Sequence, residues 1–177
     1  MTESVAARTA ALSAGTDRRE LRKVLGALQA DVAASSNQVL ASAGLVITAT
    51  TGLKVPKTGA SDFYAQVGGA LVKIAAGTDM PALSGSVAHG AFNVFAFTVD
   101  NTGTVTSAMG TPGAALGAVA FPAVPANAAV VGYVVINPTG TGSFVGGTTA
   151  LNDATVVPNA VYLSPMGSVN PLLNTLV

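Results

Sequence analysis

The chain has 177 residues, no cysteine, a formal net charge of zero and only 9% charged residues. Its length allows one domain with an extension, or two small domains. Zero net charge argues against nucleic acid, whose binding proteins carry a basic patch, and the lack of cysteine excludes disulfides and thiolate chemistry. The longest nearly unbroken apolar run, residues 128–136, is too short for a membrane span, which needs about 20 residues.

The few charges are unevenly distributed along the chain. The first 31 residues hold five basic and four acidic side chains, whereas the remaining 146 hold three lysines and four aspartates, and residues 101–152 hold none. A soluble domain normally has charge at about a quarter of its residues, and a surface with so little charge is poorly protected against association. We therefore expect a body that is covered by copies of itself or by a larger assembly.

The N-terminal region predicts a flexible arm followed by a helix. Residues 1–15 are small and polar without strong periodicity, and they do not match a signal peptide. Thr16 or Asp17 can cap a helix, with Glu20 placed as in a capping box. Apolar side chains follow at helical spacing up to the weak helix formers at residues 35–37; they are Leu21, Val24, Leu25, Leu28 and Val32.

This helix has two possible roles. It can lie on its own domain, or it can serve as a docking or self-association helix; in either case it needs a surface to lie against, because short isolated helices are marginal in water. The candidate apolar contacts are Leu21, Val24, Leu25 and Leu28. The basic residues form either a rim for an acidic partner or an ordinary solvated face, and they are Arg18, Arg19, Arg22 and Lys23.

The pattern changes near residue 38 to short runs of Val, Ile, Thr and Phe bounded by Gly, Pro and Asn, which is typical of strands. The expected strands are residues 38–50, 62–67, 70–76, 91–100, 104–108, 130–137, 142–145 and 156–163. No helix-length segments separate them for parallel crossovers. We therefore predict a mainly β protein with an N-terminal arm and amphipathic helix (residues 1–37) and an antiparallel, jelly-roll-like β-sandwich body (residues 38–177).

Several local features of the body are predicted as well. Gly68-Gly69 is expected to form a hairpin turn, and residues 100–103 a second one with Gly103 at positive φ. Residues 91–100 have apolar side chains on both faces, so this strand should be buried on both sides. Residues 110–129, with Pro122 and Pro125, and residues 138–150 are expected to be uncharged connectors that pack at subunit contacts.

The search for chemistry favours a protein without a catalytic site. The only histidine, His89, lies near Ser84 and Ser86, but without a GxSxG motif it is best interpreted as a loop residue. One histidine and no cysteine do not make a zinc site, residues 100–102 lack the acidic density of a calcium loop, and no phosphate-binding loop is present. The nine aromatic residues are expected mainly in the core. No cofactor or metal is expected.

One stretch of the body resembles a known class of protein. Residues 91–110 (AFNVFAFTVDNTGTVTSAMG) pair two strands through a D-x-x-G turn, residues 120–137 (AFPAVPANAAVVGYVVIN) give a proline-punctuated strand, and FVGGTTALND follows. This order resembles a strand module of tailed-bacteriophage virion proteins of the head decoration, cement and head-fibre types. The resemblance covers Ala91–Leu163 and transfers no catalytic residue; the first 60 residues match no particular attachment segment.

The resemblance implies a protein that sits on the capsid as a trimer and attaches through its N-terminal segment. We therefore expect a non-enzymatic decoration or cement protein on the virion surface, with the major capsid protein and further copies of the chain as partners, and no binding to nucleic acid or membrane. The alternative is a host-recognition or fibre module that binds cell-surface glycans, which needs a groove with exposed aromatic side chains. An enzyme would need converging acidic groups, and a pilus-like subunit would need a secretion signal.

Overall fold

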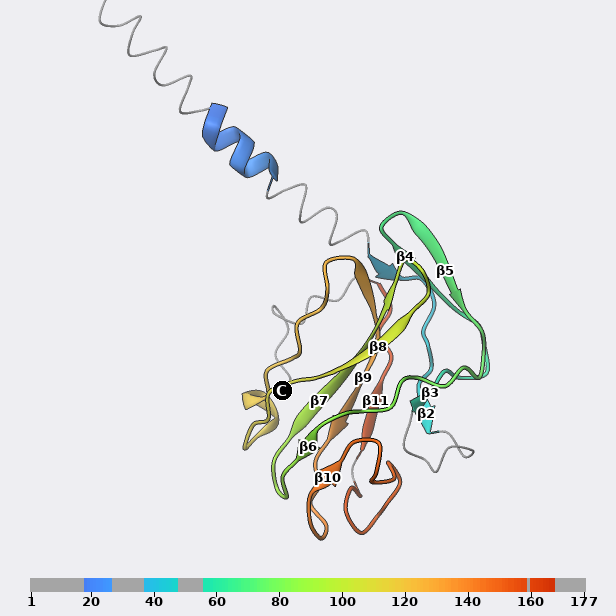
Figure 1. The fold of residues 1–177 in the computed structure, drawn as a ribbon, viewed down its shortest axis with the longest axis vertical. Coiled ribbons are helices and arrows are strands. Elements are labelled where there is room, and N and C mark those ends of the chain that lie inside the picture. Colours follow the sequence, from blue (N-terminus) through green and yellow to red (C-terminus); the bar gives the residue numbers. More distant parts are fainter. Residues whose placement is uncertain (1–17, 27–36, 48–55, 159, 168–177) are drawn as a thin grey trace, which may run out of the picture. The chain divides into compact units, whose positions relative to one another are not determined.

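The computed structural model describes residues 18–26, 37–47, 56–158 and 160–167. The chain divides into two units, Met1–Ser35 and Ser36–Val177, which are described separately. In the first, residues 18–26 form a helix. The second is mainly β, and all its paired strands run antiparallel (Figure 1). The prediction of a mainly β protein with an N-terminal helix is therefore confirmed.

Two sheets contain most of the strands. The four-stranded sheet has the order β11 (Val161–Leu163), β9 (Ala128–Ile136), β7 (Asn93–Asp100), β8 (Val105–Met109). The three-stranded sheet has the order β1 (Gln38–Val39), β4 (Phe63–Val67), β5 (Ala70–Ile74). Two short pairs complete the body, and they are β10 (Phe144–Val145) with β6 (Ser86–Val87) and β2 (Val46–Ile47) with β3 (Pro56–Lys57).

Strand β7 is buried on both faces, as its sequence predicts. Phe95, Phe97 and Val99 belong to the main core, which also contains residues of the three-stranded sheet such as Phe63. Val94 and Ala96 point to the opposite face and belong to a smaller apolar cluster. Because side chains alternate between the two faces of a strand, an uninterrupted apolar run is what a strand between two apolar layers requires.

A β-bulge in β9 changes which of its side chains face the main core. The pairing with β7 shifts register between Phe97 and Thr98, so that Gly132 lies opposite Phe97 and Val130 opposite Thr98. Val131, the extra residue, points into the main core. Side chains of odd number face this core before the bulge and those of even number face it afterwards, as expected for a one-residue insertion. A Cβ at Gly132 would lie 2.6 Å from the carbonyl oxygen of Leu163, so a larger residue does not fit there.

Both predicted hairpin turns are confirmed. Gly68 and Gly69, between β4 and β5, have φ of 56° and 82°, as a two-residue turn of type I′ requires. Gly103, between β7 and β8, has φ of 85°. There, Asp100 Oδ1 accepts hydrogen bonds from the backbone N–H of Thr102 at 2.8 Å and of Thr104 at 3.0 Å, which holds the turn in place.

Other predicted strands are shorter in the structure or divided. Residues 38–47 contain β1 and β2 separated by a turn, because Gly44 has φ of 55° and its N–H donates to Ser42 Oγ; residues 48–50 lie outside the described part. Among the described residues of the predicted strand 156–163, only Val161–Leu163 form a strand, because hydrogen bonds to Asp153 hold Thr155 and Val157 in a turn. Strand β5 ends at Ile74, ahead of the positive φ at Gly77, and β3 and β6 were not predicted.

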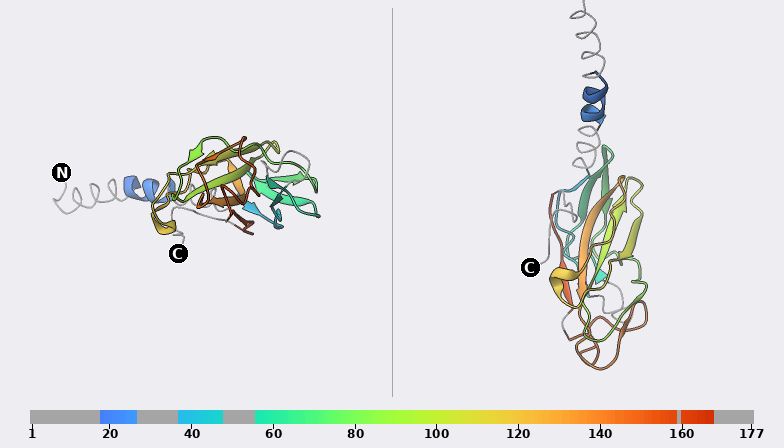
Figure 2. Two further views of the ribbon diagram at one scale, coloured as in Figure 1. Left: turned by 90° about the horizontal axis from the view of Figure 1, so that it is seen from below. Right: turned by 90° about the vertical axis from the view of Figure 1, so that its left-hand side faces the viewer.

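The segment between β8 and β9 covers the outer face of the four-stranded sheet (Figure 2). We call residues 110–127 the connector; it contains the 3₁₀ helix η1 (Leu116–Ala118) and no strand of β9's length, as Pro122 and Pro125 predict. Its half-buried apolar side chains pack on the smaller cluster, and they are Leu116, Val119, Phe121 and Val124. The sequence predicted subunit contacts for this segment and did not predict that it packs on its own sheet. Other connector residues, including Ala114, Ala118 and Ala123, are exposed.

Candidate interaction site

The N-terminal helix carries all but one of the residues predicted to bind a partner. Arg18, Arg19, Leu21, Arg22, Val24 and Leu25 lie within it and are exposed, whereas Leu28 and the predicted cap at Thr16 or Asp17 lie outside the described residues. Leu21, Val24 and Leu25 are spaced three and four residues apart, so they share one face of the helix. Their exposed fractions of 56%, 61% and 46% are large for apolar side chains.

The charges of this helix flank its apolar face unevenly. At 3.6 residues per turn, Arg18 and Arg22 border Leu21 and Leu25 on one side, whereas Arg19 points away from them. Lys23 Nζ forms an ion pair with Glu20 Oε1 at 2.9 Å. That pair is exposed, and such pairs contribute little to stability. The helix therefore presents an apolar strip with two arginines along its edge.

Among the described residues of the body, the serines near the histidine are surface residues and no metal-binding cluster is present. Ser84, Ser86 and His89 are exposed, with His89 in the turn after β6. Within the described residues, no three His, Cys, Asp or Glu side chains are grouped as a metal site would require. Asp100 Oδ1 takes part in the hairpin turn, where it also accepts a hydrogen bond from the Thr102 hydroxyl at 2.6 Å. This and the backbone hydrogen bonds hold the pKa of Asp100 below its ordinary value.

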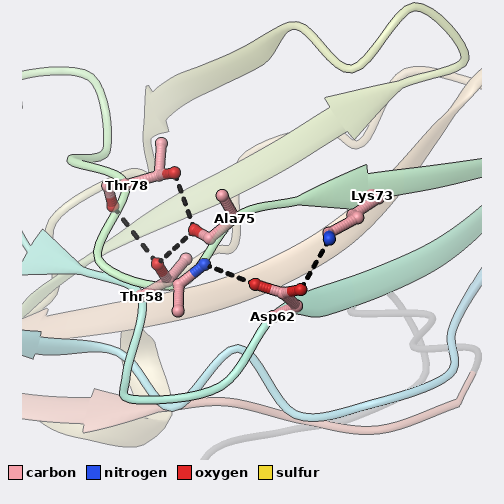
Figure 3. Close-up of polar contacts among 6 residues, drawn as sticks. Thr58, Asp62, Lys73, Ala75 and Thr78 are labelled. Atoms are coloured by element: carbon pink, nitrogen blue, oxygen red, sulfur yellow. Dashed lines mark hydrogen bonds and ion pairs between the residues drawn. The ribbon is translucent and has the colours of Figure 1, made fainter.

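A second polar group joins the start of β4 to the end of β5 (Figure 3). Asp62 Oδ2 lies 2.7 Å from Lys73 Nζ, and its Oδ1 accepts a hydrogen bond from the Ala76 N–H at 2.9 Å. The hydrogen bond with Lys73 lowers the pKa of Asp62, and the same bond raises the pKa of Lys73. The buried Thr58 hydroxyl lies 3.2 Å from the Ala75 carbonyl oxygen. These contacts join the segment before β4 to β5 and the segment after it.

The aromatic side chains lie mainly in the interior, as predicted. Phe63, Phe95, Phe97 and Phe144 are fully buried. Tyr133 packs edge-to-face against Phe121 of the connector, with ring centroids 5.1 Å apart.

Two tyrosine hydroxyls are buried within the body. The hydroxyls of Tyr133 and Tyr162 have no hydrogen-bond partner among the described residues. Burial raises the pKa of each tyrosine to about 12. Both tyrosines belong to the four-stranded sheet, Tyr133 on β9 and Tyr162 on β11, and we assign their buried side chains to its packing.

The uncharged stretch of residues 101–152 includes β8, the connector and β9, and so forms much of the four-stranded sheet and its cover. Next to it, Val161 and Leu163 of β11 lie beside Val135 and Tyr133 on the outer face and are 49% and 38% exposed. The sequence did not predict that Val161 and Leu163 are exposed. Tyr162 between them is also a large, largely hydrophobic residue, so the pattern of side chains does not show which face of the strand lies outside.

Comparison of the chain with protein-family models, with curated proteins and with solved structures found no match. Among the described residues, no helix has both the length and the apolar character that crossing a lipid bilayer requires.

Proposed function

We propose that the chain is a non-enzymatic decoration or cement protein of a tailed-bacteriophage capsid, which binds the major capsid protein on the virion surface and acts as a homo-oligomer, with the trimer as the expected form. In this proposal the body is a β-sandwich of the jelly-roll-like type and the N-terminal helix is the attachment segment. The observation that carries it is the exposed apolar strip of Leu21, Val24 and Leu25 joined to a body with very little charge.

The body supports this proposal through its two sheets. Side chains from both sheets share one core, which is how a sandwich is built. Residues 91–163, whose sequence order resembles that of phage virion proteins, contain the strands β7, β8, β9, β10 and β11. A module for binding glycans would present aromatic side chains on an open surface, whereas four of the phenylalanines here are fully buried.

The helix supplies two kinds of adhesion. Burying an exposed leucine or valine contributes up to about 1.5–3 kcal/mol, so three such side chains form a useful anchor only together with further contacts. Arg18 and Arg22 at the edge of the strip can pair with carboxylates of an acidic capsid surface. Adhesion of this kind needs no catalytic group, consistent with a function that is mechanical.

The test is sedimentation of the purified chain with shells assembled from the cognate major capsid protein. The double variant Leu21→Ser, Leu25→Ser should lose most of the binding, because it removes the apolar strip. Leu71→Ser is the matched control, since Leu71 is a 68% exposed leucine on β5 of the body, and it should bind as the wild type does. Deletion of residues 1–36 should likewise abolish binding. Undiminished binding by both N-terminal variants would contradict the attachment role.

A further inference from the structure

We propose that copies of this chain contact one another through the outer face of the four-stranded sheet and the connector that covers it. We call this surface the neutral face, and it consists of residues 110–127 with the outward side chains of β8 and β11. The inference rests on the proposed function, in which the protein is a homo-oligomer, and it names the surface that joins the copies.

The first observation is the absence of charge. No Asp, Glu, Lys, Arg or His occurs in the connector, in β8 or in β11. The charged residues of the described body lie outside these segments and are Lys57, Asp62, Lys73, Asp79, Asp100 and Asp153. A neutral face loses no charge hydration when it is buried, and it offers a charged partner no ion pair. It is therefore matched to a second neutral face, which another copy of the chain provides.

The second observation is the kind of side chain exposed there. Val161 and Leu163 are 49% and 38% exposed on β11, and Ala108 is exposed on β8. The connector adds exposed alanines and prolines, whose burial costs almost no side-chain entropy. The face comprises sixteen exposed or half-buried connector residues, two outward residues of β8 and two of β11. This lies at the lower end of the roughly 20–30 residues that one partner contributes to a stable interface.

The third observation is the edge of the sheet at β8. This strand pairs with β7 on one side, and the Ser107 hydroxyl donates to the Ala82 carbonyl oxygen at 3.0 Å. In the described part of the chain, no backbone–backbone hydrogen bond joins the other edge of β8 to a neighbour. Its sequence, Val105–Met109, contains no lysine and no proline, and its pairing with β7 has no bulge. Natural proteins protect exposed edges by such features or by covering them. A neighbouring copy would cover this edge.

The neutral face and the helix thus have different chemistry and suit different partners. The helix carries arginines beside its apolar strip, which suits a charged shell, whereas the neutral face suits only a neutral surface. This separation allows self-association and capsid binding to be tested independently of each other.

The experiment measures the native mass of the full-length chain in solution by light scattering over a dilution series. The wild type is expected as an oligomer of the 17.3 kDa chain. Val161→Lys and, separately, Ala108→Lys should shift the mass to that of one chain, because each buries a charge at the contact. Leu71→Lys is the matched control, since it also places a lysine at an exposed apolar position of an edge strand, in the other sheet, and it should keep the oligomer.

Each result decides the inference. Thermal unfolding identifies a variant that fails to fold. If Val161→Lys or Ala108→Lys does not fold, the other variant is used for the test. A monomeric wild type, or an oligomer that persists in both folded neutral-face variants, overturns the inference. Loss of the oligomer in Leu71→Lys to the same degree also overturns it. Capsid binding by any of these proteins is read separately by sedimentation, so the attachment role can stand while the neutral face fails.

Discussion

At the level of single residues, the body places polar groups where the backbone needs them. Asn37 donates from Nδ2 to the Ala126 carbonyl oxygen at 2.7 Å and accepts from the Gly68 N–H at 2.8 Å. Asn93 is fully buried and donates to the Gly110 carbonyl oxygen at 3.1 Å. Such hydrogen bonds satisfy backbone groups that would otherwise be costly to bury. They explain why Asn37 and Asn93 are buried although asparagine is typical of turns and strand ends.

The buried tyrosines make stability depend on pH in the alkaline range. An unfolded tyrosine ionises with a pKa of about 10, whereas Tyr133 and Tyr162 ionise only at about 12 in the folded body. Between these values the unfolded chain has lost protons that the folded chain retains, so the free energy of unfolding should fall as pH rises. Below the unfolded pKa both states are protonated, and the tyrosines should have no such effect.

Urea unfolding at about pH 8 and about pH 11 checks this prediction. Tyr133→Phe and Tyr162→Phe should each reduce the loss of stability at the higher pH. Near neutral pH, each should leave stability unchanged or raise it, because the hydroxyl that is removed has no partner among the described residues. Tyr64→Phe is the control for loss of the hydroxyl of a half-buried tyrosine, which here interacts with Lys73. The same alkaline loss in the wild type and in both variants would contradict the prediction.

At the level of elements, the sequence predicted the features that depend on neighbouring residues in the chain. The helix is amphipathic over residues 18–26, the Gly68-Gly69 and Gly103 turns follow from positive φ, and the double burial of β7 follows from its apolar run. The two-residue strands β3 and β6 were missed because tertiary pairing, not local pattern, defines them. The position of the connector was missed for the same reason, since Phe121 finds its partner Tyr133 only after the sheet has formed.

The connector should contribute measurably to the stability of the sheet that it covers. Phe121→Ala removes the edge-to-face contact with Tyr133 and exposes part of the smaller cluster. Because Phe121 is only half-buried, we expect a loss of about 1–2 kcal/mol, less than the loss of about 3–5 kcal/mol for the fully buried Phe95→Ala. Urea unfolding of both variants measures the difference. Wild-type stability in Phe121→Ala would show that the connector does not stabilise the sheet.

At the level of the whole molecule, the charged and the uncharged stretches of the sequence form different parts of the fold. The basic residues Arg18, Arg19 and Arg22 are on the helix, and the uncharged stretch forms β8, the connector and β9. Which apolar residues are exposed could not be predicted, because β7 and β9 have apolar side chains on both faces and only the three-dimensional order of layers separates inside from outside.

Contacts between copies should resist salt. Salt at about 1 M reduces the range of charge interactions to about 3 Å, but a contact formed by the neutral face has no charges to screen. We expect the same native mass in about 0.1 M and about 1 M NaCl, measured by light scattering. Dissociation to single chains at the higher concentration would count against a neutral contact.

The hydrogen bonds of Asn37 and the pairing of β1 have a mechanical consequence. If the helix is fixed to a shell, a force on the chain that precedes the body acts on Asn37 and β1. Val39 there exchanges hydrogen bonds with Gly167 at 3.1 and 2.8 Å, while its other neighbour is β4, and Asn37 is bonded to the Ala126 carbonyl and to the turn at Gly68. The load is therefore shared among three separate stretches of chain, namely β4 with the turn that follows it, the connector at Ala126 and the segment at Gly167. We expect the body to resist unfolding when it is pulled from its N-terminal end.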